Sequence, residues 1–331
     1  PIGCGSIYQI NEGDVNIDET GRPEYETAGM FGSQMLNSDP IILNQCNYLC
    51  NEYGLDTITV GGTIAWAMEC FSIGILSKEE LDGIDLYWGN APAILEITEK
   101  ICKGIGIGEI LANGSVFAAD YFAKGHECLV VAGKIEIPQH DPRYGPGLAR
   151  TYKYDPTPGR HVKGGLGGNC GNQPPEVKFN YDGLAEGDVA GVVLYEIMNS
   201  AGLCMFTEFG LPPGADIALI NAATGFNYND EERTILGKRL FAIRHAFNLR
   251  EGFRRKDATI SDRIIGKPPL KHGPLEGVTV DVERMGDNFF RLMGYEQDSM
   301  PKKETLEQLG NLENVIRDLY QELTGSKKDL E

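Results

Sequence analysis

The sequence predicts a mainly α-helical protein of two domains with a long irregular loop region between its helices. Apolar residues recur at helical spacing through most of the chain, and Gly or Pro residues interrupt the pattern every few turns. With 331 residues, the chain can bury a large core and divide into about two domains. We therefore expect helical domains over residues 1–135 and 136–331.

Local start and stop signals place the helices of the first domain. Asp39 followed by Pro40 predicts a helix start, because a capping side chain precedes a residue that the first turn tolerates. Gly54 predicts its end, since glycine readily adopts the left-handed conformation of a helix C-cap. Helices are expected over residues 40–54, 60–75, 92–104 and 109–122, so that the region up to about residue 125 is a helical bundle.

Residues 126–185 lack this periodicity and are rich in Pro and Gly, apart from a short strand expected at residues 129–132. A segment of this length without periodicity is either disordered or a functional loop. It carries His140, Arg143, Arg160 and His161, which favours function. Further helices are expected over residues 189–203, 215–224, 230–250, 281–292 and 302–323.

The helix at residues 230–250 raises two questions. Its Leu236, Leu240, Ile243 and Phe247 form an apolar stripe that we expect to face the core. The segment 233–256 is rich in Lys and Arg. These cations could form a solvated face, pair with acids of the neighbouring domain or lie near an anionic phosphate, and the sequence leaves the three alternatives open.

Charge and composition exclude some classes of function. The net charge of −18 argues against nucleic acid as the main partner. No run of 18 apolar residues is present, so no membrane-spanning helix is expected. The eight cysteines are scattered and no signal peptide precedes them, which predicts reduced thiols and a cytoplasmic location. Cys46 and Cys50 share one face of a helix, where core packing is favoured over a ligand pair.

Two hexapeptides share the form N-x-x-G-L-(D/C) and follow apolar helices. They are Asn51–Asp56 and Asn199–Cys204. Each could be an ordinary helix end, with Gly54 or Gly202 as a left-handed cap and a buried Leu after it. Alternatively, each turn offers a side-chain amide and backbone groups to a polar ligand, with a carboxylate or thiolate at the last position. The sequence lacks the usual phosphate-loop, serine-hydrolase and zinc-protease motifs.

The chain resembles the C-terminal two domains (domains 2 and 3) of tungsten-containing aldehyde:ferredoxin oxidoreductases. The segments that carry the resemblance, besides the two hexapeptides, are residues 1–5, 22–27, 65–69, 140–143, 155–161 and 247–253. The resemblance implies a tungsten (or molybdenum) bis-pyranopterin cofactor whose two pterins are bound by the hexapeptides. The residues implied in binding are Asn51, Leu55, Asp56, Asn199, Leu203 and Cys204.

This sequence departs from the family pattern in places. Both hexapeptides begin with Asn where the family has Asp; Asn has the same shape but donates as well as accepts hydrogen bonds. The Gly-rich stretch from Lys163 to Gly183 has no clear place in the family pattern.

The same resemblance implies a [4Fe–4S] cluster. Cys4 would be the third cysteine of the family's cluster loop and Cys204 the fourth ligand. An iron–sulfur cluster of this type needs four thiolates, so this chain supplies at most half of them. Pro1 opens the chain without Met, and we interpret the sequence as a fragment whose N-terminal domain is missing. The fragment alone is therefore expected to be inactive.

The implied reaction is the oxidation of an aldehyde to a carboxylic acid, with electrons passing through the cluster to ferredoxin. A carboxylate or imidazole must handle the protons. By the resemblance these groups are Glu26, preferred to Glu24, and His140, with His161 as a third candidate. A homodimer or an iron–sulfur partner subunit is also implied.

Two alternatives remain open at this point. The first is a tungsten enzyme of the same family that reduces an aromatic acyl-CoA or a carboxylic acid. The second is a helical interaction module without catalysis, in which the hexapeptides are ordinary helix ends. The catalytic hypothesis requires that the turns at Gly54 and Gly202 meet at one cofactor.

Overall fold

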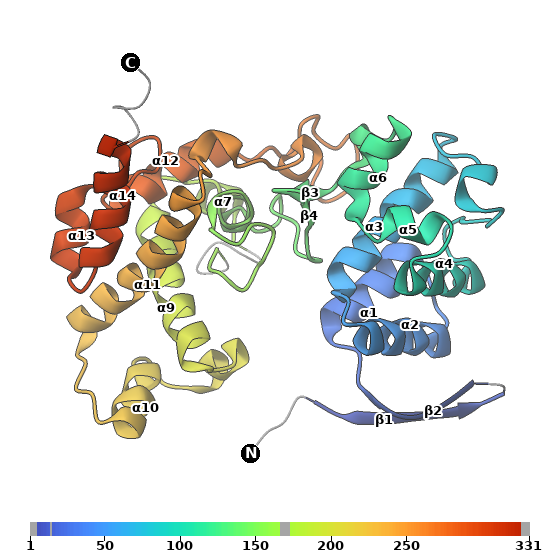
Figure 1. Ribbon diagram of the computed structural model, residues 1–331, viewed down its shortest axis with the longest axis horizontal. Coiled ribbons are helices and arrows are strands. Elements are labelled where there is room, and N and C mark those ends of the chain that lie inside the picture. The colour runs from blue at the N-terminus through green and yellow to red at the C-terminus, as the bar shows by residue number, and fades with distance from the viewer. Residues whose placement is uncertain (1–4, 14, 166–172, 326–331) are drawn as a thin grey trace. The chain divides into compact units, whose positions relative to one another are not determined.

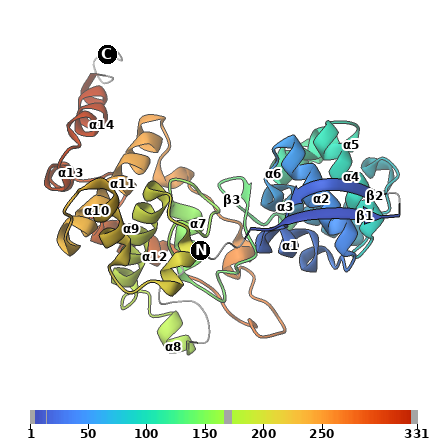
Figure 2. The same cartoon turned by 90° about the horizontal axis from the view of Figure 1, so that it is seen from below.

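The computed structural model describes residues 5–13, 15–165 and 173–325. The chain divides into two compact units, Pro1–Gln139 and His140–Glu331, here called the N-terminal and C-terminal units. Helices make up most of both units (Figures 1 and 2), which confirms the predicted mainly helical fold. Each unit is built around its own apolar core.

Six α-helices form the bulk of the N-terminal unit over the residues described. They are α1 (Tyr25–Phe31), α2 (Pro40–Tyr53), α3 (Thr57–Ser72), α4 (Ala91–Lys103), α5 (Ile107–Leu111) and α6 (Gly114–Phe122). Helix α2 begins and ends as predicted: the Asp39 carboxylate accepts hydrogen bonds from the Ile41 and Ile42 amides, and Gly54 is left-handed with φ 69°. The prediction of a single helix over residues 109–122 is wrong, because two helices, α5 and α6, occupy this segment. The chain turns between α5 and α6 at Gly114, whose φ is +87°.

A β-hairpin precedes these helices and was not predicted. Strand β1 (Ile7–Glu12) pairs antiparallel with β2 (Val15–Gly21). Ile10 lies opposite Ile17, and both are buried, whereas most of the hairpin is polar and exposed. The apolar residues Ile7, Tyr8 and Ile10 do not alternate in β1, and only Val15 and Ile17 do so in β2, so the strand pattern in the sequence is weak. The short strand expected at residues 129–132 is present as β3 (Val131–Ala132), paired with β4 (Ile135–Glu136).

Two adjacent glycines of α3 allow close packing in the N-terminal unit. A Cβ atom at Gly61 would lie 2.6 Å from the Met30 Cβ on α1, and one at Gly62 would lie 2.7 Å from the Glu136 Cβ on β4. Any larger residue there would push α1 or β4 away. Cys46 and Cys50 are fully buried in the core, as predicted, and burial raises the pKa of the Cys46 thiol to about 12.

The C-terminal unit contains eight α-helices over the residues described. They are α7 (Gly147–Tyr154), α8 (Pro175–Lys178), α9 (Ala185–Ala201), α10 (Ala215–Thr224), α11 (Asp230–Arg250), α12 (Val282–Leu292), α13 (Lys303–Leu309) and α14 (Glu313–Gly325). Helices α7 and α8 lie within the segment predicted to be irregular. The helix expected over residues 302–323 is wrong, because Gly310 ends α13 with φ +67° and the chain restarts as α14.

The predicted core-facing stripe of α11 is confirmed for Leu236 and Leu240, which pack against a small apolar cluster, but it is wrong for the second half of the helix. Ile243 and Phe247 are 45% and 56% exposed, and the buried face carries Phe241, His245 and Leu249 instead. This face was missed because a histidine and small residues interrupt its apolar pattern, so periodicity selects the neighbouring face.

Most arginines of segment 233–256 find partners within the C-terminal unit. Arg233 pairs with Asp216 at 2.8 Å, and Arg255 pairs with Asp287 at 2.6 Å. Arg239 donates to the Leu309 carbonyl oxygen at 3.0 Å. The arginines of this segment therefore connect α11, and the residues that follow it, to other parts of the same unit.

His245 predicts a pH dependence of stability. Burial lowers its pKa from the ordinary value of 6.5 to about 4, and its Nε2–H donates to the Ser299 carbonyl oxygen at 2.8 Å. Below pH 6.5 His245 is protonated in the unfolded chain, whereas in the folded chain it stays neutral down to about pH 4. The free energy of unfolding therefore falls as the pH falls through this window. Between pH 7 and 4.5 we expect a loss of about 2 kcal/mol from this group.

Urea unfolding of the wild type and His245→Gln at both pH values measures this contribution. Gln still donates a hydrogen bond but does not titrate. The wild type should lose more stability than the variant on acidification. Equal losses would contradict a neutral, buried imidazole at this position.

Candidate functional site

The two hexapeptides adopt the same backbone turn. The Leu55 amide donates to the Cys50 carbonyl oxygen at 2.8 Å, and the Leu203 amide donates to the Met198 carbonyl oxygen at 2.9 Å. The intervening Gly54 and Gly202 have φ values of 69° and 70°. This is the Schellman turn that ends many helices. The predicted helix ends are thus confirmed, and glycine is required because other residues are strained at such φ values.

The last positions of the two turns differ. Asp56 is the N-cap of α3, where its carboxylate accepts from the Thr59 amide at 3.2 Å and from the Thr59 hydroxyl at 2.7 Å. Cys204 is exposed and carries a free thiol that makes no capping hydrogen bond. At the first positions, Asn51 is exposed, and the Asn199 amide donates to the Val162 carbonyl oxygen at 3.1 Å.

Glu26 lies in the first turn of α1 and is 4% exposed. Its carboxylate accepts the Gln139 backbone amide at 2.8 Å, while the neighbouring Glu24 is exposed and caps α1 through the Glu26 amide at 2.9 Å. Gly29 makes room for this contact, because a Cβ there would lie 2.7 Å from the Gln139 Cγ. The Gln139 side chain also bonds to the Met30 sulfur at 3.0 Å. Glu26 is therefore a buried carboxylate, as a tuned proton-handling group requires.

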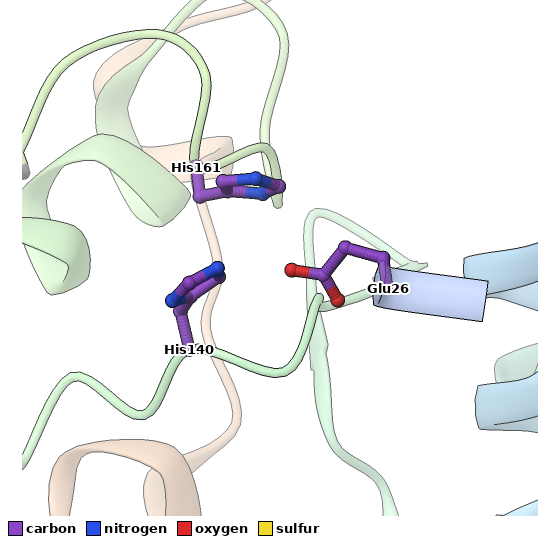
Figure 3. A group of neighbouring side chains, drawn as sticks. All are labelled: Glu26, His140 and His161. Carbon is purple, nitrogen blue, oxygen red and sulfur yellow. The ribbon is translucent and has the colours of Figure 1, made fainter. Parts of the chain in front are cut away.

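His140 follows Gln139 directly in the chain and begins the C-terminal unit. Its ring lies next to that of His161, with centroids 4.6 Å apart and the planes tilted by 34°. Figure 3 shows these two rings, which come from different loops, and the Glu26 side chain at the start of its helix. A ring nitrogen of each histidine lies within 4.8 Å of one on the other. The Tyr152 hydroxyl holds the His140 backbone by donating to its carbonyl oxygen at 3.0 Å.

Helix α11 holds the loop that carries His161. Arg244 contacts the Asp155 carboxylate at 2.6 Å and the Thr157 hydroxyl at 2.8 Å, and it also pairs with Glu196 of α9. The Asn248 amide donates to the Pro156 carbonyl oxygen at 2.8 Å. Burial raises the pKa of Glu196, against the opposing effect of Arg244. A loop without regular structure is thus fixed at several points before it reaches His161.

The structure brings some of the predicted residues together. His140 and His161 meet within the C-terminal unit, and the Glu26 carboxylate binds the residue that precedes His140. Cys4 lies outside the described residues. Sequence reasoning missed Gln139, Tyr152 and the role of Arg244, because each acts across a long sequence separation that no local pattern encodes.

Comparisons with known proteins identify the family to which this mainly helical chain belongs. The family model described as aldehyde ferredoxin oxidoreductase, domains 2 & 3, matches residues 1–310. The chain therefore belongs to the aldehyde ferredoxin oxidoreductase family. Among the residues that the structure describes, no helix is both long and apolar enough to cross a membrane.

Individual relatives support the same family. The tungsten-containing aldehyde ferredoxin oxidoreductase of Pyrococcus furiosus is 33% identical over 322 residues, which are 94% of this chain and 51% of the relative. The aliphatic sulfonate oxidoreductase, WOR-like subunit, of the same organism is 27% identical over 94% of this chain and 49% of its own length. This chain thus spans about half the length of the curated relatives it matches.

A solved structure has the same fold. It is the active site complex BamBC of benzoyl coenzyme A reductase in complex with 1,5 dienoyl-CoA, with a TM-score of 0.71 and 21% identity. The match covers 97% of this chain and 53% of that chain.

Replacing Arg244 tests how the His161 loop is held. Arg244→Met leaves Asp155 and Glu196 buried without their cation, which should cost about 3–5 kcal/mol of stability. Arg250→Met is the matched control, since Arg250 lies on the same helix and pairs with exposed Glu251, and should cost less than about 1 kcal/mol. Urea unfolding measures both, and similar costs would contradict the network.

The second turn gives another test. Gly202→Ala places a Cβ in open space but at φ 70°, so we expect a loss of roughly 1–2 kcal/mol from backbone strain alone. Gly191→Ala, inside α9 and equally open, should stabilise the protein by up to about 1 kcal/mol. Thermal unfolding should shift in opposite directions for the two variants, and shifts in the same direction would argue against a strained turn at Gly202.

Proposed function

We propose that this chain is part of a tungsten (or molybdenum) bis-pyranopterin oxidoreductase that oxidises aldehydes to carboxylic acids. Electrons leave through a [4Fe–4S] cluster to ferredoxin in the cytoplasm. Family membership supports the class of enzyme. The observation that carries the proposal for this chain is the repeated turn at Asn51–Asp56 and Asn199–Cys204, which presents the same backbone geometry twice, as binding two pterins requires.

The residues of the turns fit a pterin. A Cβ at Gly54 or Gly202 would meet nothing within 4 Å, so the backbone of each turn faces open space that a flat heterocycle can approach. The exposed amides of Asn51 and Asn199 can donate and accept hydrogen bonds with such a ring. In this assignment Leu55 and Leu203 support the turns from their half-buried positions, and Asp56 contributes a carboxylate.

The fit to the iron–sulfur cluster is partial. Cys204 is an exposed, free thiol, which suits a cluster ligand. Cys4 is assigned as a second ligand. Four thiolates are needed, so the remaining two must come from elsewhere in the holoenzyme, and the isolated chain would be inactive.

Proton handling is assigned to this chain's own residues. Conversion of an aldehyde and water to a carboxylic acid releases two protons and two electrons. When bound, the metal centre accepts the electron pair and polarises the carbonyl group. The buried Glu26 carboxylate and the neighbouring His140 and His161 rings are suited to accept the protons and pass them on.

A second candidate function is the reduction of an aromatic acyl-CoA by a tungsten enzyme of the same family. The fold likeness to the benzoyl coenzyme A reductase complex is the observation that favours it. Both candidates need the same cofactor. Activity of the intact holoenzyme toward short and aromatic aldehydes with ferredoxin, set against activity toward benzoyl-CoA, separates them.

Cofactor analysis tests the class before any substrate is known. The intact protein should contain tungsten or molybdenum and release a fluorescent pterin after oxidative extraction. A homodimer or a complex with an iron–sulfur subunit is the expected form for electron transfer to ferredoxin. A protein that yields neither metal nor pterin would instead be a non-catalytic helical module.

Glu26→Gln should slow aldehyde oxidation by roughly 10²–10⁴-fold without loss of metal or pterin, because the amide cannot take up a proton. Glu24→Gln is the matched control: it lies two residues away, is exposed, and as Gln can still accept the capping hydrogen bond of α1. Steady-state kinetics across the pH range measures both variants. Equal activity of Glu26→Gln and Glu24→Gln would remove Glu26 from the mechanism.

A further inference from the structure

A hollow of about 500 Å³ opens in the C-terminal unit between α9, α10 and the first half of α11. Hollows of this volume typically hold one small organic molecule. Helices α9 and α11 are in close contact at Gly237, where a Cβ would lie 2.7 Å from the Val193 carbonyl oxygen. The space therefore arises from the way α10 is attached.

Helix α10 is anchored near both ends, and its Ile217 and Ile220 pack against an apolar cluster that includes residues of α9 and α11. Asp216 in its first turn pairs with Arg233 of α11 at 2.8 Å. Near its other end, Asn221 exchanges two hydrogen bonds with the Tyr228 backbone, at 2.9 and 3.0 Å. Only Asp216 and Ile217 of this helix are buried. Leu219 and Ala223 of the same helix are exposed and line the hollow.

The lining of the hollow is apolar, and none of the described residues that line it is charged. Leu219 and Phe226 are 48% and 56% exposed there. Polar groups in the lining are few: the Thr224 hydroxyl already donates to the Ile220 carbonyl oxygen at 2.7 Å, which leaves the hydroxyls of Ser200 and Tyr228. A charged ligand would lose its hydration here without gaining a partner.

We propose that this hollow binds an uncharged, mainly apolar small molecule, such as an aliphatic chain with a single hydroxyl or carbonyl group. Apolar area removed from water would supply most of the affinity, and one hydroxyl of the lining would orient the polar group. Ser200, Ala201 and Leu203 of the second hexapeptide form part of the wall, so the ligand would lie against that turn. The inference does not depend on the proposed reaction.

The test is a titration of the intact protein with N-phenyl-1-naphthylamine, an uncharged probe that fluoresces in apolar surroundings. We expect saturable binding that 1-octanol displaces and octanoate, its charged analogue, does not. Ala223→Trp fills the hollow and should weaken probe binding by about 10-fold or more. Ala222→Trp is the matched control, because Ala222 is exposed on the same helix but does not line the hollow, and it should bind as the wild type does.

A smaller change provides a second readout in case the Trp variants fold poorly. In Ala223→Cys the new thiol should react with iodoacetamide more slowly when the probe is present, whereas Ala222→Cys should be unaffected. Peptide mass spectrometry separates both sites from the exposed Cys204. Probe binding that is not saturable, that octanoate displaces as well as octanol does, or that Ala223→Trp leaves unchanged overturns the proposal. So does a change in sedimentation rate with Ala223→Trp and no change in probe affinity, because a second copy of the chain would then occupy the hollow.

Discussion

The ion pairs of the Arg244 guanidinium hold the loop that carries His161 in the C-terminal unit. They connect α11 to Asp155 at the end of α7 and to Glu196 in α9, and both carboxylates are buried. A buried carboxylate without a cation would be strongly unfavourable, so each of these segments has one acceptable position relative to α11. The loop from Asp155 to His161 is therefore held next to α11 at its first residues. The loop that carries His161 is thus held by a charge network, whereas the His140 backbone is held by the Tyr152 hydroxyl.

In the N-terminal unit, buried carboxylates hold other segments of the chain in place through hydrogen bonds to backbone amides. Glu26 accepts the Gln139 amide, and Glu136 accepts the Ser115 amide and hydroxyl. Such contacts require the chain to come very near, which Gly29 and Gly62 permit. Glycine and carboxylate thus act together, because the glycine removes the steric barrier and the charge selects the amide that fills the space.

The sequence could predict those features that are encoded locally. The start of α2 at Asp39-Pro40 and the ends of α2 and α9 at Gly54 and Gly202 depend on a few neighbouring residues. The buried face of α11 could not be predicted, because packing against α9, α13 and α14, and against the phenylalanine rings of α12, decides which side of that helix is covered, and His245 lies on the covered side. The polar β-hairpin was missed for the related reason that little of its pattern is apolar.

The candidate site was predicted from the resemblance and not from local pattern. Glu26 and His140 are separated by more than a hundred residues, and nothing in the spacing of either reports the other. What the structure adds is the set of contacts within each unit: the Glu26 carboxylate accepts the Gln139 amide, and the Tyr152 hydroxyl donates to the His140 carbonyl oxygen. Neither Gln139 nor Tyr152 carries a chemical signature in the sequence.

The repeated turn can be divided into what the fold requires and what it does not. Glycine and the following leucine amide are required at both sites, because they complete the helix-ending hydrogen bonds. At the last position Asp56 is also required, as the N-cap of α3. Cys204 occupies the equivalent position but caps nothing and leaves its thiol exposed. An exposed thiol without a structural role is open to oxidation, and the proposed role as a cluster ligand would explain why a cysteine stands here. In contrast to Asp56, Cys204 is thus a residue whose identity the fold does not explain.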